Sequence, residues 1–179
     1  MTIRYIADMH FDEEDIIAYD NRPFNSAAEM NDAMIRNWNR VVGDDDFTWI
    51  LGDFCAGDGA RWREILLQLR GRKGLIRGNH DDPAAVEAAR DLFEDVADYK
   101  EIVDEGRHVV LSHYPIPSFR DHYFGWYHLY GHVHTSFEWN IAENAKRLIQ
   151  KLYVRDDVCR MTNVGAMVPY VNYTPITII

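Results

Sequence analysis

Hydrophobic positions recur along the chain with two different periods, which predict strands and helices in alternation. Apolar side chains occupy alternate or consecutive positions in residues 2–7, 47–51 and 74–76, as expected for short strands. Between these stretches, apolar residues recur every three or four positions over 27–42 and over 62–69, which predicts two amphipathic helices. The first half of the chain therefore has the strand and helix order of an α/β protein.

Predicted strands dominate the second half. Pro83 suits the first turn of a helix that runs to about residue 92, and a further helix is predicted over 140–153. The remaining apolar stretches predict strands at 99–103, 107–111, 126–130, 159–164 and 173–178. Strands that first alternate with helices and then dominate favour two packed mixed sheets with helices outside them. The 179 residues fit a single domain, 1–179.

Charge and hydropathy restrict the partners and the location. No stretch approaches the roughly 18 consecutive apolar residues that a membrane span needs, and the N-terminus lacks the pattern of a secretion signal. We therefore expect a cytoplasmic protein with no membrane partner. The net charge of −10 repels polyphosphate backbones, so duplex nucleic acid is not an expected partner. The only two cysteines, Cys55 and Cys159, are predicted to be buried small side chains.

Metal-binding side chains follow five predicted strands. They are Asp8 with His10, Asp53, Asn79 with His80, His113, and His132 with His134. Carboxylates, imidazoles and an amide oxygen suit manganese, iron or zinc. Side chains two positions apart on a strand face the same side, so each spaced pair can converge. With Asp53 as a bridge, the set suffices for two ions roughly 3.5 to 4 Å apart.

Glycine precedes the polar residue at three of these strand ends. Gly52, Gly78 and Gly131 stand directly before Asp53, Asn79 and His132. A residue without Cβ lets the chain turn sharply and approach a metal or phosphate closely. Each glycine could instead belong to a plain turn, but the recurrence at three strand ends favours close approach over coincidence.

The order Asp-x-His, Gly-Asp, Gly-Asn-His-Asp, Ser-His and Gly-His-x-His resembles the calcineurin-like metallophosphoesterase superfamily. The resemblance runs from Ile3 to at least His134, and Asn163-Val164-Gly165 looks like the family's closing strand. Residues 8–11, 21–24 and 37–39 also resemble a small bacterial and phage branch of about this length. The resemblance implies a four-layer α/β/β/α sandwich.

The resemblance also implies the roles of the polar residues. One metal would be held by Asp8, His10, Asp53 and His134, and a second by Asp53, Asn79, His113 and His132. The ions would be divalent or trivalent, with Mn²⁺ expected and Fe, Zn or Ni as alternatives. The catalytic residues would be Asp53, Asn79 and His80, with His80 close to the phosphate as proton donor or charge stabiliser. A hydroxide bridging the two ions would attack a small phosphoester, a phosphodiester in preference to a phosphomonoester.

The chain departs from the superfamily pattern in two places. Position 56 is Ala56, where phosphoprotein phosphatases carry an aspartate that orients the catalytic histidine, so Asp81 or the backbone would have to hold His80. Residues 12–15, Asp-Glu-Glu-Asp, also differ from the small branch, where Gly, His and Asn are expected. No metal ligand is lost.

Three residues outside the ligand set are candidate substrate contacts. Arg22 and Arg77 flank motif blocks and are candidate phosphate contacts, and His122 is a candidate pocket residue. Six basic residues within 61–77 favour a solvated surface over a nucleic-acid patch, yet they leave open a nuclease acting on single strands or ends. A non-catalytic scaffold of the same fold is the other alternative. The oligomeric state is left open.

Overall fold

The first sheet contains four parallel strands from the first half of the chain. The computed structural model describes residues 1–178. Strands β1 (Ile3–Ile6), β2 (Phe47–Ile50), β3 (Arg72–Ile76) and β4 (Asp95–Ala97) lie in the order β1-β2-β3-β4, and each neighbouring pair is parallel. Parallel neighbours bring the carboxyl ends of β1, β2 and β3 to the same edge of the sheet.

The second sheet is mixed. Its strands are β5 (Tyr99–Asp104), β6 (Arg107–Ser112), β7 (Tyr127–Tyr130) and β8 (Arg160–Asn163), in the order β5-β6-β7-β8. The pair β5 and β6 is antiparallel, whereas β6, β7 and β8 run parallel. The prediction of two sheets is confirmed, but the mixed pairing is confined to the second sheet.

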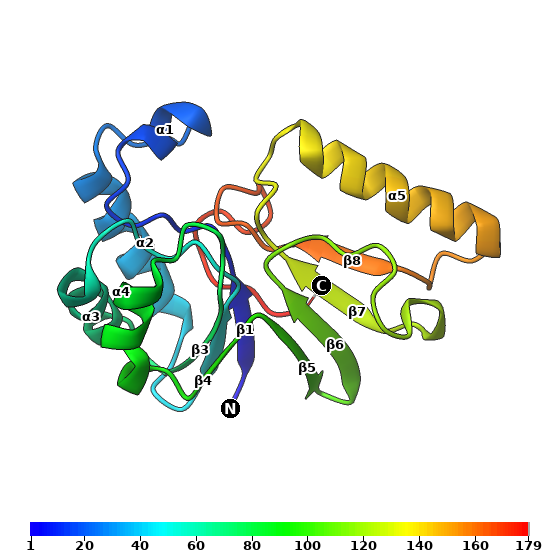
Figure 1. Cartoon of the computed structure of the whole chain (residues 1–179), viewed down its shortest axis with the longest axis horizontal. Coiled ribbons are helices and arrows are strands. Elements are labelled where there is room, and N and C mark those ends of the chain that lie inside the picture. The colour runs from blue at the N-terminus through cyan, green and yellow to red at the C-terminus, as the bar shows by residue number, and fades with distance from the viewer. Residues whose placement is uncertain (179) are drawn as a thin grey trace.

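Three hydrophobic layers hold the sheets and helices together. Ile6 and Ile50 face one layer, shared with the helices of the first half, while Tyr5 and Trp49 face a second layer between the sheets. Val110 faces a third layer beneath the last helix. Alternate strand residues thus pack on opposite faces, as a strand period of two requires. The result is the four-layer α/β/β/α arrangement, with the two sheets meeting at the centre (Figure 1).

Helices cover the outer faces of both sheets. Helices α2 (Ala27–Val41), α3 (Gly59–Gln68) and α4 (Pro83–Ala88) lie beside the first sheet, and α5 (Phe137–Tyr153) lies over the second (Figure 1). The Oγ of Ser26 accepts a hydrogen bond at 3.2 Å from the backbone N–H of Glu29 and caps α2. The short elements are α1 (Asp15–Tyr19), η1 (Arg90–Leu92) and η2 (His122–Phe124).

The strand predicted over 173–178 does not form. Only Ile176 bridges to Tyr5 of β1, through two backbone hydrogen bonds of 2.7 and 3.0 Å. Asn172 and Tyr173 have positive φ angles, and Pro175 has no N–H to donate to a neighbouring strand. The apolar side chains of Tyr173 and Ile178 are buried, although the segment is not a strand.

Cys55 and Cys159 are buried free thiols, as predicted. Within residues 1–178, no helix has the length and apolar character required to cross a bilayer.

Candidate metal centre

The carboxyl ends of five strands deliver polar side chains to one region between the two sheets. Asp8 follows β1, Asp53 follows β2 and Asn79 follows β3. His113 follows β6, and His132 with His134 follows β7. The structure thus brings together all seven side chains that the sequence analysis named as metal ligands.

The backbone at this region adopts a conformation that side chains other than glycine seldom take. Asp8, His10, Asp53, His132 and His134 all have φ between 47° and 67°. Such left-handed conformations cost free energy and cluster at functional sites, where the surrounding fold holds them in place. Here they turn successive side chains toward a common point.

Two glycines make the close approach of the strand ends sterically feasible. Gly52 has a φ of +88°, and a Cβ there would collide with Nδ1 of His113. A Cβ on Gly78 would collide with Oδ1 and the backbone nitrogen of Asp53. The predicted role of these glycines in close packing therefore has a specific steric cause.

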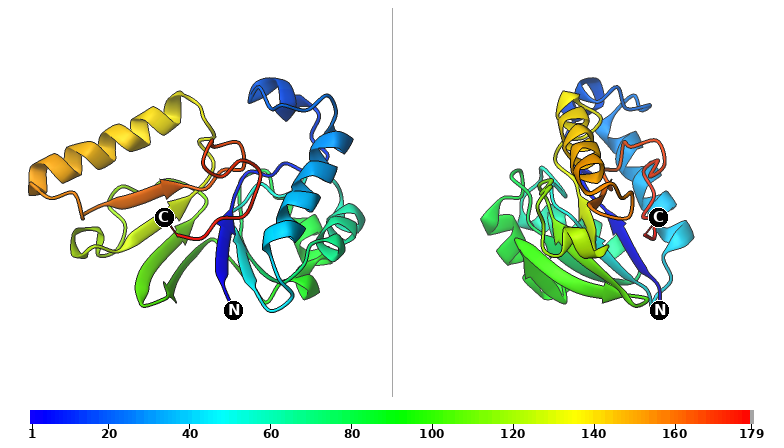
Figure 2. Two further views of the ribbon diagram at one scale, coloured as in Figure 1. Left: turned by 180° about the vertical axis from the view of Figure 1, so that it is seen from behind. Right: turned by 90° about the vertical axis from the view of Figure 1, so that its right-hand side faces the viewer.

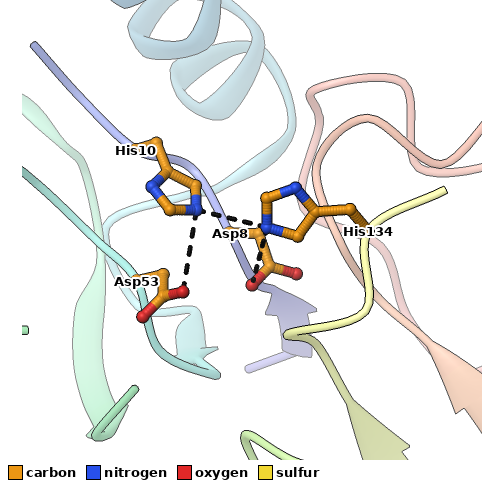
Figure 3. Close-up of side chains that lie close together, drawn as sticks. All are labelled: Asp8, His10, Asp53 and His134. Atoms are coloured by element: carbon orange, nitrogen blue, oxygen red, sulfur yellow. Dashed lines mark hydrogen bonds and ion pairs between the residues drawn. The ribbon is translucent and has the colours of Figure 1, made fainter. Parts of the chain in front are cut away.

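The first candidate metal position is formed by Asp8, His10, Asp53 and His134, which are all buried (Figure 3). One ligand atom from each of the four lies within 4.8 Å of the others. The Nε2 atoms of His10 and His134 are 3.3 Å apart, and Nε2 of His10 lies 3.7 Å from Oδ2 of Asp53. Nε2 of His134 lies 3.8 Å from Oδ1 of Asp8.

The second candidate metal position lies on the other side of Asp53. Oδ1 of Asn79 lies 3.0 Å from Nε2 of His113 and 2.8 Å from Nδ1 of His132. Nε2 of His113 is 3.4 Å from Oδ2 of Asp53. Oδ2 of Asp53 thus lies close to a histidine of each position. The other oxygen, Oδ1, accepts a hydrogen bond from the backbone N–H of His80 at 2.9 Å.

The donor set fits a divalent metal ion. Oδ2 of Asp8 is buried without a hydrogen-bond partner in the described chain, an arrangement that is costly for a carboxylate unless a cation is near. Nε2 of His10 and Nε2 of His134 lie 3.3 Å apart, and both Nδ1 atoms face carboxylates, so each neutral ring presents an unprotonated Nε2 that a shared cation can bind. Carboxylate and imidazole ligands suit manganese, iron or zinc.

Two carboxylates that the sequence analysis missed hold the histidines of the first position. Nδ1 of His10 donates to Glu13 at 2.6 Å, and Nδ1 of His134 donates to Asp20 at 2.8 Å. Each contact fixes the tautomer that leaves Nε2 free to bind a metal. Glu13 belongs to the acidic segment that departs from the small branch. Asp20 is 114 positions from His134, so no local pattern could reveal the pair.

Arg22 has a structural role in place of the predicted phosphate contact. Its guanidinium is buried, donates to the backbone carbonyls of Asp8 and Met9 at 2.9 Å, and forms an ion pair with Asp20 at 2.9 Å. These bonds use its hydrogen-bond donors inside the protein. Arg22 therefore holds Asp20 against His134 and is not available to a substrate.

The electrostatics couple the buried carboxylates to the imidazoles. Burial alone would raise the pKa of Asp53, but the hydrogen bond and charge of His113 lower it to about 2. Burial alone would lower the pKa of His113, but Asp53 and Asp8 raise it to about 9. The pKa of His134 is raised by Asp20 in spite of burial, whereas burial and the charge of His113 lower the pKa of His132.

His80 lies at the edge of the first position. Its ring meets that of His10 edge to face, with 5.4 Å between the centroids, and the side chain is exposed. Asp81 accepts backbone hydrogen bonds from Asp53, Phe54 and Gly78 instead of contacting the His80 ring. The carboxylate of Asp81 therefore braces the loop, and the backbone bond from His80 to Asp53 fixes the position of His80.

The remaining substrate candidates lie outside the cavity beside the ligands. Arg77 is exposed and pairs with Asp98 at 2.7 Å. His122 lies in η2, where its Nδ1 is 3.0 Å from the carbonyl oxygen of Phe119. The other basic residues of 61–77 are also occupied: Arg61, Arg63, Arg70 and Arg72 pair with carboxylates, and Lys73 is buried. The basic residues of 61–77 therefore do not form a patch of unpaired charges for nucleic acid.

A cavity of about 590 Å³ opens beside the ligands. Ile16 and Tyr19 of α1 line one side, and Phe137 and Glu138 of α5 line another, so the cavity lies between elements of the two halves. Glu13 and Asp15 add two more carboxylates to its wall. A substrate entering here would reach His80 and both candidate metal positions.

Two packed sheets with carboxylate and imidazole ligands at their strand ends define a metallohydrolase fold and site. The sequence pattern of calcineurin-like phosphoesterases matches residues 1–156. The chain therefore belongs to the calcineurin-like phosphoesterase family and is a hydrolase, which confirms the resemblance. Enzymes of this family bind divalent metals.

Several relatives have similar sequences or structures. The uncharacterised protein MJ1445 of Methanocaldococcus jannaschii is 36% identical over 136 residues, covering 75% of this chain and 70% of the relative. The Gene 66 protein of Mycobacterium phage D29 is 32% identical over 160 residues, covering 73% of this chain and 79% of the relative. The crystal structure of AQ665 from Aquifex aeolicus, a protein of unknown function, superposes with a TM-score of 0.71 at 27% identity, covering 97% of this chain and 94% of that one.

Proposed function

We propose that this protein is a phosphodiesterase that uses two metal ions shared by Asp53. The observation that carries the proposal is the single oxygen, Oδ2 of Asp53, that faces His10 at 3.7 Å and His113 at 3.4 Å. When bound, two such ions lower the pKa of a shared water and neutralise charge on the phosphoryl oxygens. Mn²⁺ suits the mixed oxygen and nitrogen donors.

The candidate ligands and His80 would have different roles in the reaction. Asp8, His10 and His134 hold the first position, and Asn79, His113 and His132 hold the second. His80 lies at the cavity wall, where it can donate a proton to the leaving oxygen or a hydrogen bond to developing negative charge. Asp8 and Asp53 are buried, so the charges at the first position interact in a medium of lower dielectric constant than water.

The charge of the cavity favours a diester over a monoester. No lysine or arginine is among the residues that line the cavity within residues 1–178, whereas Glu13, Asp15 and Glu138 contribute carboxylates. A phosphomonoester carries up to two negative charges near neutral pH and a phosphodiester only one. The carboxylates therefore repel the monoester more strongly. They also oppose a nuclease that tracks a polyanionic strand. A cytoplasmic location stays a prediction.

Hydrolysis of paired aryl substrates tests the proposal. Metal-stripped protein is assayed with Mn²⁺ on bis-p-nitrophenyl phosphate and on p-nitrophenyl phosphate, and kcat/KM is compared. We expect the diester to be preferred, and we expect Asp53→Asn to reduce hydrolysis to background while the circular dichroism spectrum is unchanged. An equally active Asp53→Asn protein contradicts the metal mechanism. A preference for the monoester contradicts only the substrate class. No turnover with any divalent ion supports a non-catalytic scaffold.

A further inference from the structure

Helix α5 carries exposed apolar side chains along one flank. Only Ala142 is buried among its residues. The large side chains Phe137, Ile141, Leu148 and Leu152 are 76%, 54%, 57% and 71% exposed. Together with the partly exposed Ala145, these residues recur at steps of three or four and form one line along the helix, termed here the α5 stripe. Contiguous exposed apolar surface of this kind marks an interaction site.

Other residues of α5 make the contacts that attach it to the second sheet. Ala142 packs in the third hydrophobic layer with Val110 and Tyr130, and Nζ of Lys146 donates to the carbonyl oxygen of Met161 at 3.0 Å. The helix lies along the outer surface of the molecule (Figure 2). Ile141 and Ala145 of the stripe also border a pocket with Pro115 and Pro117. The large stripe side chains stay more than half exposed, so they can meet another surface.

The stripe has nearly the same spacing when it is followed in either direction. Four positions separate Phe137 from Ile141, four also separate Leu148 from Leu152, and Ala145 lies between the two pairs. A twofold interface requires such self-complementarity, because residue i of one copy meets residue j of the other and the reverse. Two α5 helices packed antiparallel would set Phe137 against Leu152 and Ile141 against Leu148. The small Ala145 side chain would allow close approach at the axis.

Charges along α5 favour the antiparallel direction. Glu138 lies at the N-terminal end of the helix, whereas Arg147 and Lys151 lie in its C-terminal half, and all three are exposed. Antiparallel packing sets the acidic end of each helix beside the basic half of the other, and it also opposes the two helix dipoles. Parallel packing would set like charges side by side.

We propose that the α5 stripe is the contact surface for a second copy of this chain, in an antiparallel helix pair with its twofold axis close to Ala145. The contact has a consequence for the cavity, because Phe137 both begins the stripe and lines the cavity. The C-terminal end of α5 in the second copy, at Leu152, would cover Phe137. The dimer would thereby fix one wall of the substrate cavity.

The mass in solution tests the contact with a matched control. The wild-type protein is expected to be a dimer by light scattering after size-exclusion chromatography, and Leu152→Glu is expected to be a monomer with an unchanged Tm. Leu67→Glu places the same charge on α3 at a side chain that is 69% exposed, against 71% for Leu152, and should stay dimeric. A monomeric wild-type protein at about 100 µM, or a Leu152→Glu dimer, overturns the proposal. The Asp53→Asn protein should be equally dimeric, which separates this test from that of the proposed function.

Cysteine cross-linking tests the direction of the pair. The native Cys55 and Cys159 are buried, so an introduced surface thiol can be oxidised selectively. Ala145→Cys should form a disulfide-linked dimer, because each Ala145 lies at the axis. Phe137→Cys should not link to itself but should link to a Leu152→Cys chain in a mixture. Self-linking of Phe137→Cys without the mixed product would overturn the antiparallel arrangement.

Discussion

The two candidate metal positions differ in what holds their histidines. At the first position, carboxylates of Glu13 and Asp20 accept from the Nδ1 atoms of His10 and His134. At the second position, Nδ1 of His113 lies 2.8 Å from the carbonyl oxygen of Leu51, and His132 presents Nδ1 itself to the site. A carboxylate behind an imidazole makes it more basic and fixes its orientation.

The histidines of the first position are also more deeply buried than His132 of the second. The side chain of His134 is 8% exposed, whereas that of His132 is 31% exposed. The second position is more accessible to solvent, and we expect the first to bind a metal ion more tightly. We expect metal-stripped protein to bind Mn²⁺ in two steps, with the first position filled first.

The largest expected effect comes from removing one ligand of each position. His134→Gln should weaken the tighter Mn²⁺ step by more than about 100-fold, because losing a ligand costs more than losing the carboxylate behind it. His132→Gln should abolish only the weaker step. Isothermal titration of metal-stripped protein measures both, and His122→Gln, outside the cavity, is the matched control. A His132→Gln protein that loses the tighter step would reverse the order of the two positions.

Asp20→Asn is expected to have the next largest effect. Without the carboxylate on His134, Mn²⁺ affinity at the tighter step should fall by about 10- to 100-fold, measured by the same titration. The single variant also leaves the buried Arg22 without its ion-pair partner, which is destabilising. The double variant Asp20→Asn/Arg22→Met removes that buried charge and should recover stability without recovering Mn²⁺ affinity. Recovery of affinity would show that Asp20 acts only through folding.

Glu13→Gln should have a smaller effect at the same position. The Glu13 side chain is 27% exposed, against 2% for Asp20, so water can replace part of its contact with His10. We expect a loss of Mn²⁺ affinity of up to about tenfold. Glu14→Gln is the neighbouring control, because Glu14 accepts from the backbone N–H of Ala27 and not from a ligand. Equal losses in both variants would contradict the role of Glu13.

The free energy of unfolding of the metal-free protein should depend on pH through His113 of the second position. His113 has a pKa of about 9 in the folded protein and about 6.5 as its unperturbed value. The folded state therefore holds this proton more tightly, and the resulting stability is complete below pH 6.5 and is lost as the pH rises through 9. Urea unfolding at pH 6, 7.5 and 9 should show this loss, and His113→Gln should reduce it. A pH dependence unchanged in His113→Gln would contradict the pairing with Asp53.

Much of the fold could be predicted from hydrophobic periodicity. The strand ends at Ile6, Ile50 and Ile76 were each followed in the sequence by polar residues, and parallel pairing brings such ends together. The prediction was wrong at 173–178, because positive φ angles and Pro175 limit that apolar stretch to one bridge. Strand β4 was missed, because its three residues are too few to show a period.

The candidate metal ligands could be predicted from the sequence, whereas the residues that hold those ligands in place could not. Asp53, Asn79 and His132 sit in short motifs directly after glycines, so their positions are local properties of the sequence. Asp20 and Arg22 act through contacts across the fold, from residue 20 to residue 134 and from residue 22 to the backbone of residues 8 and 9. Such contacts depend on tertiary packing. The role of the basic residues in 61–77 likewise depends on tertiary contacts, because their carboxylate partners lie elsewhere in the sequence.

The claim that Asp53 joins two ions is tested most directly by anomalous X-ray diffraction from crystals soaked in Mn²⁺. Two peaks about 3.5 to 4 Å apart are predicted, one beside His10 and His134 and the other beside Asn79 and His113, with the Asp53 carboxylate between them. A single peak, or two peaks that Asp53 does not contact, would contradict the account.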